Sequence, residues 1–391
     1  MKSFPESLLN KLKKRQLSNA LRNLSGVTSG VDFSSNDYLG FAKNEILFDE
    51  VHELLIQKGI KQNGATGSRL LSGNHALYQQ TESYIASFHQ VESALIFNSG
   101  YDANIGFFSS VPQRNDIVLY DEMCHASIRD GIQMGLAKSF KFKHNDVSDL
   151  ENVLSRTITN SNPNAVYIVT ESVFSMDGDT PDLKKLVEMS LKYKAYVVVD
   201  EAHALGVFGE NGCGLVQQYG LQDHVFARIV TFGKALGIHG AAILGSKHLN
   251  QYLINFTRSF VYTTGLSPHA VASIYVAYQY LSKCEEERQR LFENINYFRN
   301  NVPLNLQNQS SFSPIQSIII SGNNQVKSTA EILQKNGIEV KPILSPTVPK
   351  GQERLRFCLH SYNTKQEILK VLNLLKNVTT DGTDEMDFHR K

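Results

Sequence analysis

A lysine between two glycines and a carboxylate–histidine pair are the residues of this chain whose spacing points most directly to chemistry. Lys234 lies in the stretch Thr231–Gly237, just after an apolar run. Asp200 and His203 follow a second apolar run, in the order Asp-Glu-Ala-His. A lysine can form a Schiff base, and a carboxylate can pair with a protonated ring nitrogen. Because a lysine beside glycines is more often a solvated loop residue, these residues alone leave both interpretations open.

Three other apolar runs also end in polar groups. Ser99-Gly100-Tyr101 precedes a predicted helix, and the free backbone N–H groups of such a turn can hold a phosphate, although an ordinary strand-to-helix turn looks the same. His125 and Ser175 follow two further runs, at the strand ends where open α/β sheets bind ligands. The neighbouring Cys124 does not indicate a thiol nucleophile, because adjacent side chains do not readily face each other.

The elements that must position these groups alternate along the chain. The predicted strands are 94–97, 117–120, 140–142, 165–170, 195–199, 225–232 and 240–244, with helices between most of them. This alternation predicts an α/β fold with a mostly parallel sheet covered by helices. The polar groups would then share one edge of the sheet. A Schiff-base lysine, a partner for a ring nitrogen, a flat stacking group and a phosphate cradle together describe a site for pyridoxal 5'-phosphate.

The chain changes character after Pro303. Short strands at 315–320, 338–341 and 354–359, with helices at 325–336 and 364–377, predict a small C-terminal α+β domain. We therefore expect four parts. They are an N-terminal helix (within 6–24) and substrate-site loop in 1–45, a large cofactor-binding domain in 46–280, the small domain in 281–377 with a connector helix from about 268, and a disordered tail in 378–391.

Composition excludes several classes of protein. The 391 residues carry a formal net charge of +1, with no basic footprint for nucleic acid or an anionic membrane. Four widely spaced cysteines predict neither a metal site nor a disulfide framework, and they fit a reducing compartment. No apolar run is long enough to span a membrane, and the first residues do not form a signal peptide. We expect a cytoplasmic protein.

Seven segments resemble one enzyme family. They are SNDYLG at 35–40, GSRLLSG at 67–73, FNSGY at 97–101, HAS at 125–127, TESVFSMDG at 170–178, VDEAH at 199–203 and TFGK at 231–234. Together they resemble the α-oxoamine synthases, fold-type I pyridoxal-phosphate transferases that join an amino acid to an acyl thioester and release CO2. The resemblance runs from about residue 5 to residue 377. It implies an acyltransferase that works as a homodimer with active sites at the subunit interface.

The resemblance also implies roles for the residues that could bind the cofactor. Lys234 would form the Schiff base and carry the proton, Asp200 would pair with the ring nitrogen, and His203 would pair with the ring 3-oxygen. His125 would stack on the ring and act as an acid. The phosphate would be held by the backbone N–H groups of Gly100 and Tyr101 and by the Thr231 hydroxyl, while Ser175 would support the cofactor.

A second set of residues would bind the substrate. The resemblance places Arg22, Asn36, His125, Thr347 and Arg356 at the substrate site. Arg356 suits the substrate carboxylate, because a guanidinium can bind it in a bidentate manner. Arg354 alternates with it along the same strand, so only one of the two can face the site, and we expect the other to be solvated.

The substrates are less sharply indicated. Within the family, SRLLSG at 68–73 and PTVP at 346–349 look most like the member of biotin synthesis that condenses L-alanine with a pimeloyl thioester. A member that uses glycine with acetyl-CoA, or serine with a palmitoyl thioester, would share every cofactor residue. The sequence does not distinguish CoA from a carrier protein as the thiol. An aminotransferase on the same scaffold and a non-catalytic subunit are the remaining alternatives; the presence of Lys234, Asp200 and His125 disfavours the second.

Overall fold

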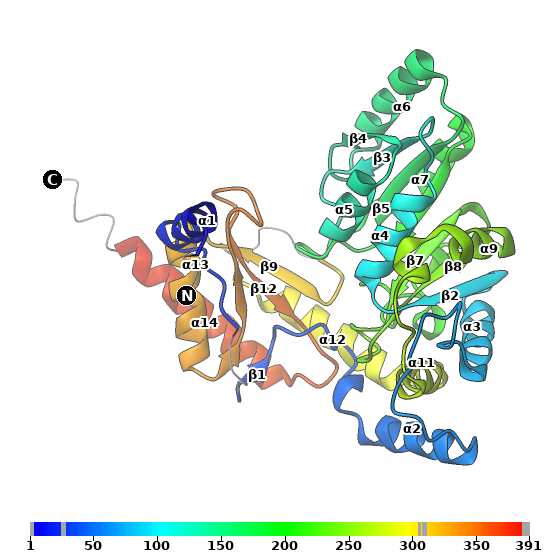
Figure 1. Cartoon of the computed structure of the whole chain (residues 1–391). Coiled ribbons are helices and arrows are strands. Elements are labelled where there is room, and N and C mark those ends of the chain that lie inside the picture. Colours follow the sequence, from blue (N-terminus) through cyan, green and yellow to red (C-terminus); the bar gives the residue numbers. More distant parts are fainter. Residues whose placement is uncertain (1–3, 25–28, 304–305, 307–310, 385–391) are drawn as a thin grey trace. The chain divides into compact units, whose positions relative to one another are not determined.

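The computed structural model of the chain describes residues 4–24, 29–303, 306 and 311–384. The chain forms two compact units, which Figure 1 traces from the N-terminus in blue to the C-terminus in red. We call Asn36–Ser175 with Asp179–Gln289 the large unit. Met1–Ser35, Met176–Gly178 and Arg290–Lys391 form the small unit.

The large unit is built on a seven-stranded sheet with the order β2-β8-β7-β6-β5-β3-β4. The strands are β2 Ser93–Phe97, β3 Ile117–Asp121, β4 Lys138–Phe142, β5 Val166–Glu171, β6 Tyr196–Asp200, β7 Ala227–Thr231 and β8 Ala241–Gly245. β4, β3, β5, β6 and β7 run parallel to one another, and β8 is antiparallel to both of its neighbours. β5 is buried along its whole length, as expected for a strand covered on both faces. The predicted mostly parallel sheet is confirmed.

Helices contact this sheet along most of its width, with α4, α6, α7 and α9 packed against its strands (Figure 1). The helices are α2 Glu45–Gln57, α3 Ala76–Phe88, α4 Gly100–Ser110, α5 Ala126–Met134, α6 Val147–Ser161, α7 Leu183–Tyr193, α8 Leu215–Gln218, α9 Lys247–Phe256, α10 Arg258–Val261, α11 Pro268–Leu281 and α12 Glu285–Asn301. Short 3-10 turns occupy η1 Phe41–Lys43, η2 Glu210–Gly212 and η3 Gln222–His224. The connector helix predicted from about 268 is two helices, because Lys283 N–H bonds the Tyr280 carbonyl at 2.8 Å and tightens the last turn of α11.

The small unit holds an antiparallel sheet with the order β11-β12-β9 and a separate parallel pair of β1 with β10. The strands are β1 Val31–Asp32, β9 Ile315–Ile319, β10 Ile338–Glu339, β11 Lys341–Ile343 and β12 Arg354–Cys358. The helices are α1 Glu6–Leu17, α13 Asn323–Lys335, α14 Lys365–Asp384 and most of α12. The strand predicted at 338–341 is two short strands on either side of Val340.

The terminal helices differ in length from their predictions. α1 ends at Leu17, because the Ser18 hydroxyl donates to the Lys14 carbonyl at 3.0 Å and Asn19 takes a left-handed φ of 49°. α14 continues past Asn377 to Asp384, and 385–391 of the expected tail lie outside the described residues. In the part of the chain that the structure describes, no helix combines the length and the apolar character needed to cross a membrane.

Candidate active site

A cavity of about 160 Å³ in the large unit gathers most of the predicted cofactor residues. It is lined by Gly100, Tyr101, Asn104, His125, Ser127, Glu171, Asp200, Ala202, Ile229, Thr231 and Lys234. The parallel strands β3, β5, β6 and β7 end here, so their following loops deliver side chains to one place. The sequence therefore predicted correctly that these strand ends would meet.

Lys234 is held by His203. Its Nζ lies 2.8 Å from His203 Nε2, and the lysine itself is half-buried. The turn around it is fixed by hydrogen bonds from Gly237 N–H to the Lys234 carbonyl at 2.8 Å and from Ile238 N–H to the Phe232 carbonyl at 3.0 Å. Gly237 has a φ of +62°, and a side chain there would collide with the backbone of Ala42. The glycine that follows the lysine is thus required by the turn.

Asp200 is buried with both carboxylate oxygens occupied. Oδ2 accepts from Asn104 Nδ2 at 2.8 Å, and Oδ1 accepts from the backbone N–H of Ala202 at 2.9 Å. Asn104 Nδ2 also donates to Ser127 Oγ at 3.0 Å. Two N–H donors favour the ionised form of a buried carboxylate. This arrangement suits a group that must stay anionic beside a protonated ring nitrogen.

His125 is the N-cap of α5. Its Nδ1 lies 2.7 Å from Ser127 Oγ and accepts from the Ser127 backbone N–H at 3.3 Å, so a neutral ring carries its proton on Nε2. Burial lowers the pKa of His125; the charge of Asp200 opposes the shift and that of Lys234 adds to it. A neutral, proton-bearing ring at the cavity wall can both stack on a flat cofactor and donate a hydrogen bond.

Glu171 is a second buried carboxyl group of the cavity. Its Oε1 accepts from the His125 backbone N–H at 2.6 Å. Burial raises the pKa of Glu171 well above its usual value, and the negative charge of Asp200 adds to the shift. Burial and the neighbouring Asp200 charge thus both disfavour the ionised form of Glu171, whereas Asp200 has two N–H donors on its own carboxylate oxygens.

The N-terminus of α4 forms the phosphate side of the cavity. Ser99 caps this helix by accepting from Asp102 N–H at 3.0 Å. A Cβ on Gly100 would lie 3.3 Å from the Thr231 side chain, so glycine keeps the space between α4 and β7 open. The Tyr101 hydroxyl donates to Asp130 at 2.8 Å, and Tyr101 also lines the cavity. The Thr231 hydroxyl donates to the Gly240 carbonyl at 3.2 Å and would have to turn to donate to a phosphate.

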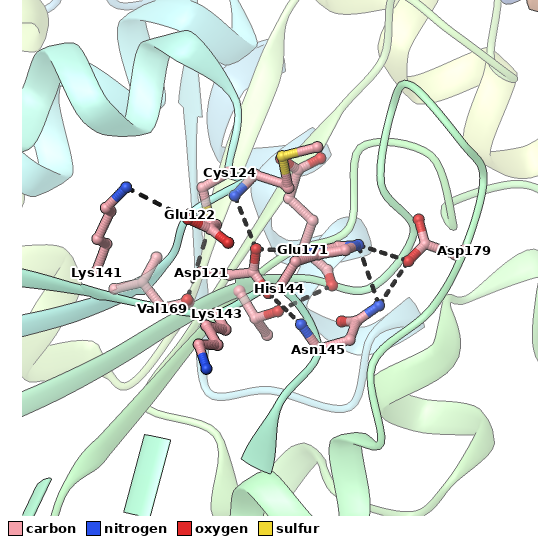
Figure 2. A network of polar contacts seen from close by, with 12 residues as sticks. Asp121, Glu122, Cys124, Lys141, Lys143, His144, Asn145, Val169, Glu171 and Asp179 are labelled. Atoms are coloured by element: carbon pink, nitrogen blue, oxygen red, sulfur yellow. Dashed lines mark hydrogen bonds and ion pairs between the residues drawn. The ribbon is translucent and has the colours of Figure 1, made fainter. Parts of the chain in front are cut away.

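Ser175 lies outside the residues that line the cavity. It is half-buried in the turn after β5, where Phe174 N–H bonds the Asp179 carbonyl at 2.9 Å. Figure 2 shows how this turn is tied to the end of β3: His144 reaches Asp121 with Nδ1 at 2.9 Å and Asp179 with Nε2 at 2.7 Å. Asn145 Nδ2 donates to the same Asp179 oxygen at 2.5 Å. The predicted role of Ser175 stays a prediction.

The predicted substrate residues are divided between the units. Asn36 belongs to the large unit, where its Oδ1 accepts from the Tyr38 hydroxyl at 3.2 Å. In the small unit, Arg22 donates to the Thr347 hydroxyl at 3.1 Å, and the predicted place of both at the substrate site stays a prediction. Arg356 is half-buried on β12.

The expectation that the second arginine of β12 is solvated is wrong. Arg354 is only 4% exposed and forms an ion pair with Asp177. Ser317 on the neighbouring strand β9 donates to the same Asp177 oxygen at 2.8 Å. The half-buried Asp177 carboxylate explains why a guanidinium is tolerated on this face of the strand.

The side chains present fit pyridoxal phosphate. An amine, an anionic carboxylate and a neutral imidazole face one cavity, next to a helix N-terminus for a phosphate. Asn104 Oδ1 is buried without a hydrogen-bond partner among the described residues, so the cavity wall has an unused acceptor. A cavity of this kind on a sheet of this order defines a fold-type I pyridoxal-phosphate-dependent transferase.

Comparison with known proteins agrees with this class. The chain belongs to the aminotransferase class I and II family, whose profile matches residues 28–374. The 8-amino-7-oxononanoate synthase of Emericella nidulans is 41% identical, and the alignment covers 94% of each chain. The enzyme of the same name from Lysinibacillus sphaericus is 38% identical, with 88% of each chain covered.

Solved structures show the same fold. A serine palmitoyltransferase from S. paucimobilis, with bound PLP and myriocin, matches with a TM-score of 0.86 and 26% identity over 96% of this chain and 97% of that one. The 8-amino-7-oxononanoate synthase of Francisella tularensis matches with a TM-score of 0.76 and 29% identity over 92% and 99%. Both enzymes are α-oxoamine synthases, so the predicted family, the pyridoxal-phosphate cofactor and the acyltransferase class are confirmed.

Four residues of the site were not assigned a role from the sequence. They are Tyr38, Asn104, Ser127 and Glu171, which contact His203, Asp200, His125 and the His125 backbone respectively. Glu171 could have been found from the sequence, because an acidic residue that ends a buried strand is costly to bury without a functional or structural reason. The other three are small or uncharged polar residues whose partners only the fold brings near.

Proposed function

We propose that this enzyme condenses L-alanine with a pimeloyl thioester to give 8-amino-7-oxononanoate, CO2 and a free thiol, a step of biotin synthesis. One observation supports these substrates above the others. Relatives named 8-amino-7-oxononanoate synthase align with 94% and 88% of this chain at 41% and 38% identity. The serine palmitoyltransferase that shares the fold is only 26% identical.

The cavity residues have distinct tasks in this proposal. When bound, pyridoxal phosphate supplies an electron sink for the bonds at the α-carbon of the amino acid. Lys234 Nζ takes and returns the proton at that carbon, and His203 lies next to it at 2.8 Å. Asp200, held by Asn104 and Ala202, presents a fixed negative charge to the ring nitrogen. The Nε2 proton of His125 is available to the carbonyl oxygen of the acyl group.

The remaining predicted residues complete the proposal. Gly100, Tyr101 and Thr231 hold the phosphate at the N-terminus of α4, and Ser175 supports the cofactor from the turn after β5. The substrate is bordered by Arg22, Asn36, His125 and Thr347, and Arg356 takes its carboxylate.

The substrates are tested by measuring thiol and CO2 release from purified enzyme loaded with cofactor. Alanine, glycine and serine are each combined with pimeloyl, acetyl and palmitoyl thioesters, on CoA and on acyl carrier protein. We expect alanine with a pimeloyl thioester to give the highest kcat/KM. A higher value for glycine with acetyl-CoA, under the same conditions, would overturn the proposed substrates and leave the family assignment intact.

Serine with a long acyl thioester is the second candidate. It is favoured by the TM-score of 0.86 to the serine palmitoyltransferase, against 0.76 to the Francisella enzyme. The serine and palmitoyl arms of the same assay decide between the two. Conversion of a keto acid to an amino acid without CO2 release would instead indicate an aminotransferase.

We further propose that the enzyme is a cytoplasmic homodimer. Support for the dimer comes from two exposed apolar side chains, Leu71 at 84% and Tyr262 at 75%, on turns that meet through the Gly265–Gly67 hydrogen bond of 3.0 Å. Support for a reducing compartment comes from Cys124, Cys213, Cys284 and Cys358, which are buried free thiols.

A further inference from the structure

A row of hydrogen bonds leads from the lysine to a buried tyrosine that has no assigned role. Lys234 Nζ lies 2.8 Å from His203 Nε2, and His203 Nδ1 lies 2.7 Å from the Tyr38 hydroxyl. The Tyr38 hydroxyl reaches Asn36 Oδ1 at 3.2 Å. Tyr38 has no exposed surface and His203 is only 3% exposed. The geometry of His203 is thus set on both ring nitrogens by groups of the large unit.

When Lys234 is an ammonium, each hydrogen bond of this row is donated in the direction from Lys234 toward Asn36. An ammonium can only donate, so Nε2 of His203 accepts and the neutral ring carries its proton on Nδ1. Nδ1–H then donates to the Tyr38 oxygen, and the Tyr38 hydroxyl donates to Asn36 Oδ1. Every bond of the row is satisfied.

If His203 pairs with the ring 3-oxygen of the cofactor, as the resemblance to the α-oxoamine synthases implies, Nε2 would need the opposite arrangement. A ring oxygen that carries negative charge can only accept, so His203 would have to offer it an N–H from Nε2. The neutral ring then has a bare Nδ1, which needs a donor. A hydroxyl can turn to supply that donor, whereas a carboxylate could not, and an amide N–H could serve only this second arrangement. The Tyr38 hydroxyl can therefore hydrogen-bond to His203 Nδ1 in either neutral tautomer of the ring.

We propose that Tyr38 is a positioning residue that lets His203 change tautomer, from an acceptor for the Lys234 ammonium to a donor for the bound cofactor. The role rests on the cofactor and on the contacts above, not on the identity of the amino acid or acyl substrate. The other titratable groups that line the cavity with Lys234 are His125, Glu171 and Asp200.

The first test is a spectroscopic titration of the full-length holoenzyme with Tyr38→Phe. The variant keeps the buried ring but cannot donate to His203 Nδ1, so Nε2–H becomes a weaker donor and the anionic cofactor oxygen is less stabilised. We expect the pH midpoint of the absorption change of the bound cofactor to rise by about 0.5–1 unit, and the dissociation constant of pyridoxal phosphate to rise about 3–10-fold. Tyr278→Phe is the matched control, because Tyr278 is also fully buried and its hydroxyl also bonds a histidine, His89 at 3.0 Å.

Two further variants separate positioning from a general loss of structure. 3-Fluorotyrosine at position 38 keeps the hydroxyl and makes it a stronger donor, so the midpoint should move in the opposite direction. In a His203→Gln background, Tyr38→Phe should have no further effect on the midpoint or on the dissociation constant.

Equal midpoints for wild type, Tyr38→Phe and the fluorotyrosine form would overturn the proposal, and so would an undiminished Tyr38→Phe effect in the His203→Gln background. Failure of the proposed substrates would appear only in the turnover assay, because these titrations contain neither amino acid nor thioester.

Discussion

At the residue scale, two neighbouring carboxyl groups of the site have different surroundings. Asp200 and Glu171 are both buried, yet Asp200 has two N–H donors on its carboxylate, while burial and the charge of Asp200 raise the pKa of Glu171. Two carboxyl groups in different surroundings can serve different functions in one cavity. The two N–H donors suit Asp200 to the role of the negative charge beside a ring nitrogen.

Replacement of the lysine tests the cofactor assignment at this scale. Lys234→Ala removes the amine of the cavity, so borohydride should no longer fix the cofactor to the chain, and kcat should fall by about 10²–10⁴-fold, the range for loss of a proton-transferring group. Absorption spectra and mass spectrometry after reduction measure the attachment. Lys247→Ala, outside the cavity at the start of α9, is the control and should still be trapped at Lys234. Continued trapping in Lys234→Ala would show that another amine holds the cofactor.

At the element scale, His144 joins the loops that follow two neighbouring strands. Both ring nitrogens face carboxylate oxygens, at 2.9 Å from Asp121 and 2.7 Å from Asp179, so both carry protons. Burial acts to lower the pKa of His144, but the hydrogen bonds and charges of the two aspartates outweigh it and raise the pKa to about 10. One aspartate ends β3, just before the His125 loop, and the other closes the turn that carries Ser175.

The contribution of His144 to the stability of the fold changes with pH in a definite direction. Since the folded-state pKa of His144 is raised, its stabilisation is fully present below the usual value of 6.5 and is lost as the pH rises through about 10. We expect His144→Gln to lower the free energy of unfolding at neutral pH by about 2–3 kcal/mol, typical of hydrogen bonds to charged groups.

Urea denaturation at a series of pH values measures this difference. The difference in the free energy of unfolding between wild type and His144→Gln should narrow as the pH approaches and passes about 10. His224→Gln, at an exposed histidine, should change the free energy of unfolding little at any pH. A gap that is constant across this range would show that the imidazolium charge is not responsible.

Local sequence patterns predicted the strands and helices better than they predicted which side chains contact one another. Apolar runs bounded by turn residues placed the strands of the large sheet and the groups at their ends, because both are local signals. The end of α1 depends on the Ser18 hydroxyl and the left-handed Asn19, which periodicity does not show. Arg354 was misjudged because its partner, Asp177, lies far away in the sequence. Tyr38 was missed because a buried hydroxyl shows its role only beside His203.

At the scale of the whole molecule, exposed apolar side chains predict self-association. Sedimentation of the wild type at micromolar concentration should show a dimer. Leu71→Asp should weaken it at least about tenfold, because a buried charge without a partner opposes association. Leu191→Asp changes an equally apolar side chain, 61% exposed on α7, and should leave the dimer intact. A monomeric wild type, or equal behaviour of the two variants, would contradict the proposed dimer.

The place of β8 in the sheet also decides when during synthesis the site can form. Gly100 follows β2 and Thr231 ends β7, yet these strands are not neighbours: Ala241 of β8 pairs with both Phe97 and Thr231. The two sides of the phosphate cradle therefore meet only after a strand made later than either has inserted between them. A nascent chain would therefore complete this cradle only after Gly245 has left the ribosome, and cofactor binding would then stabilise chains in which β8 has inserted.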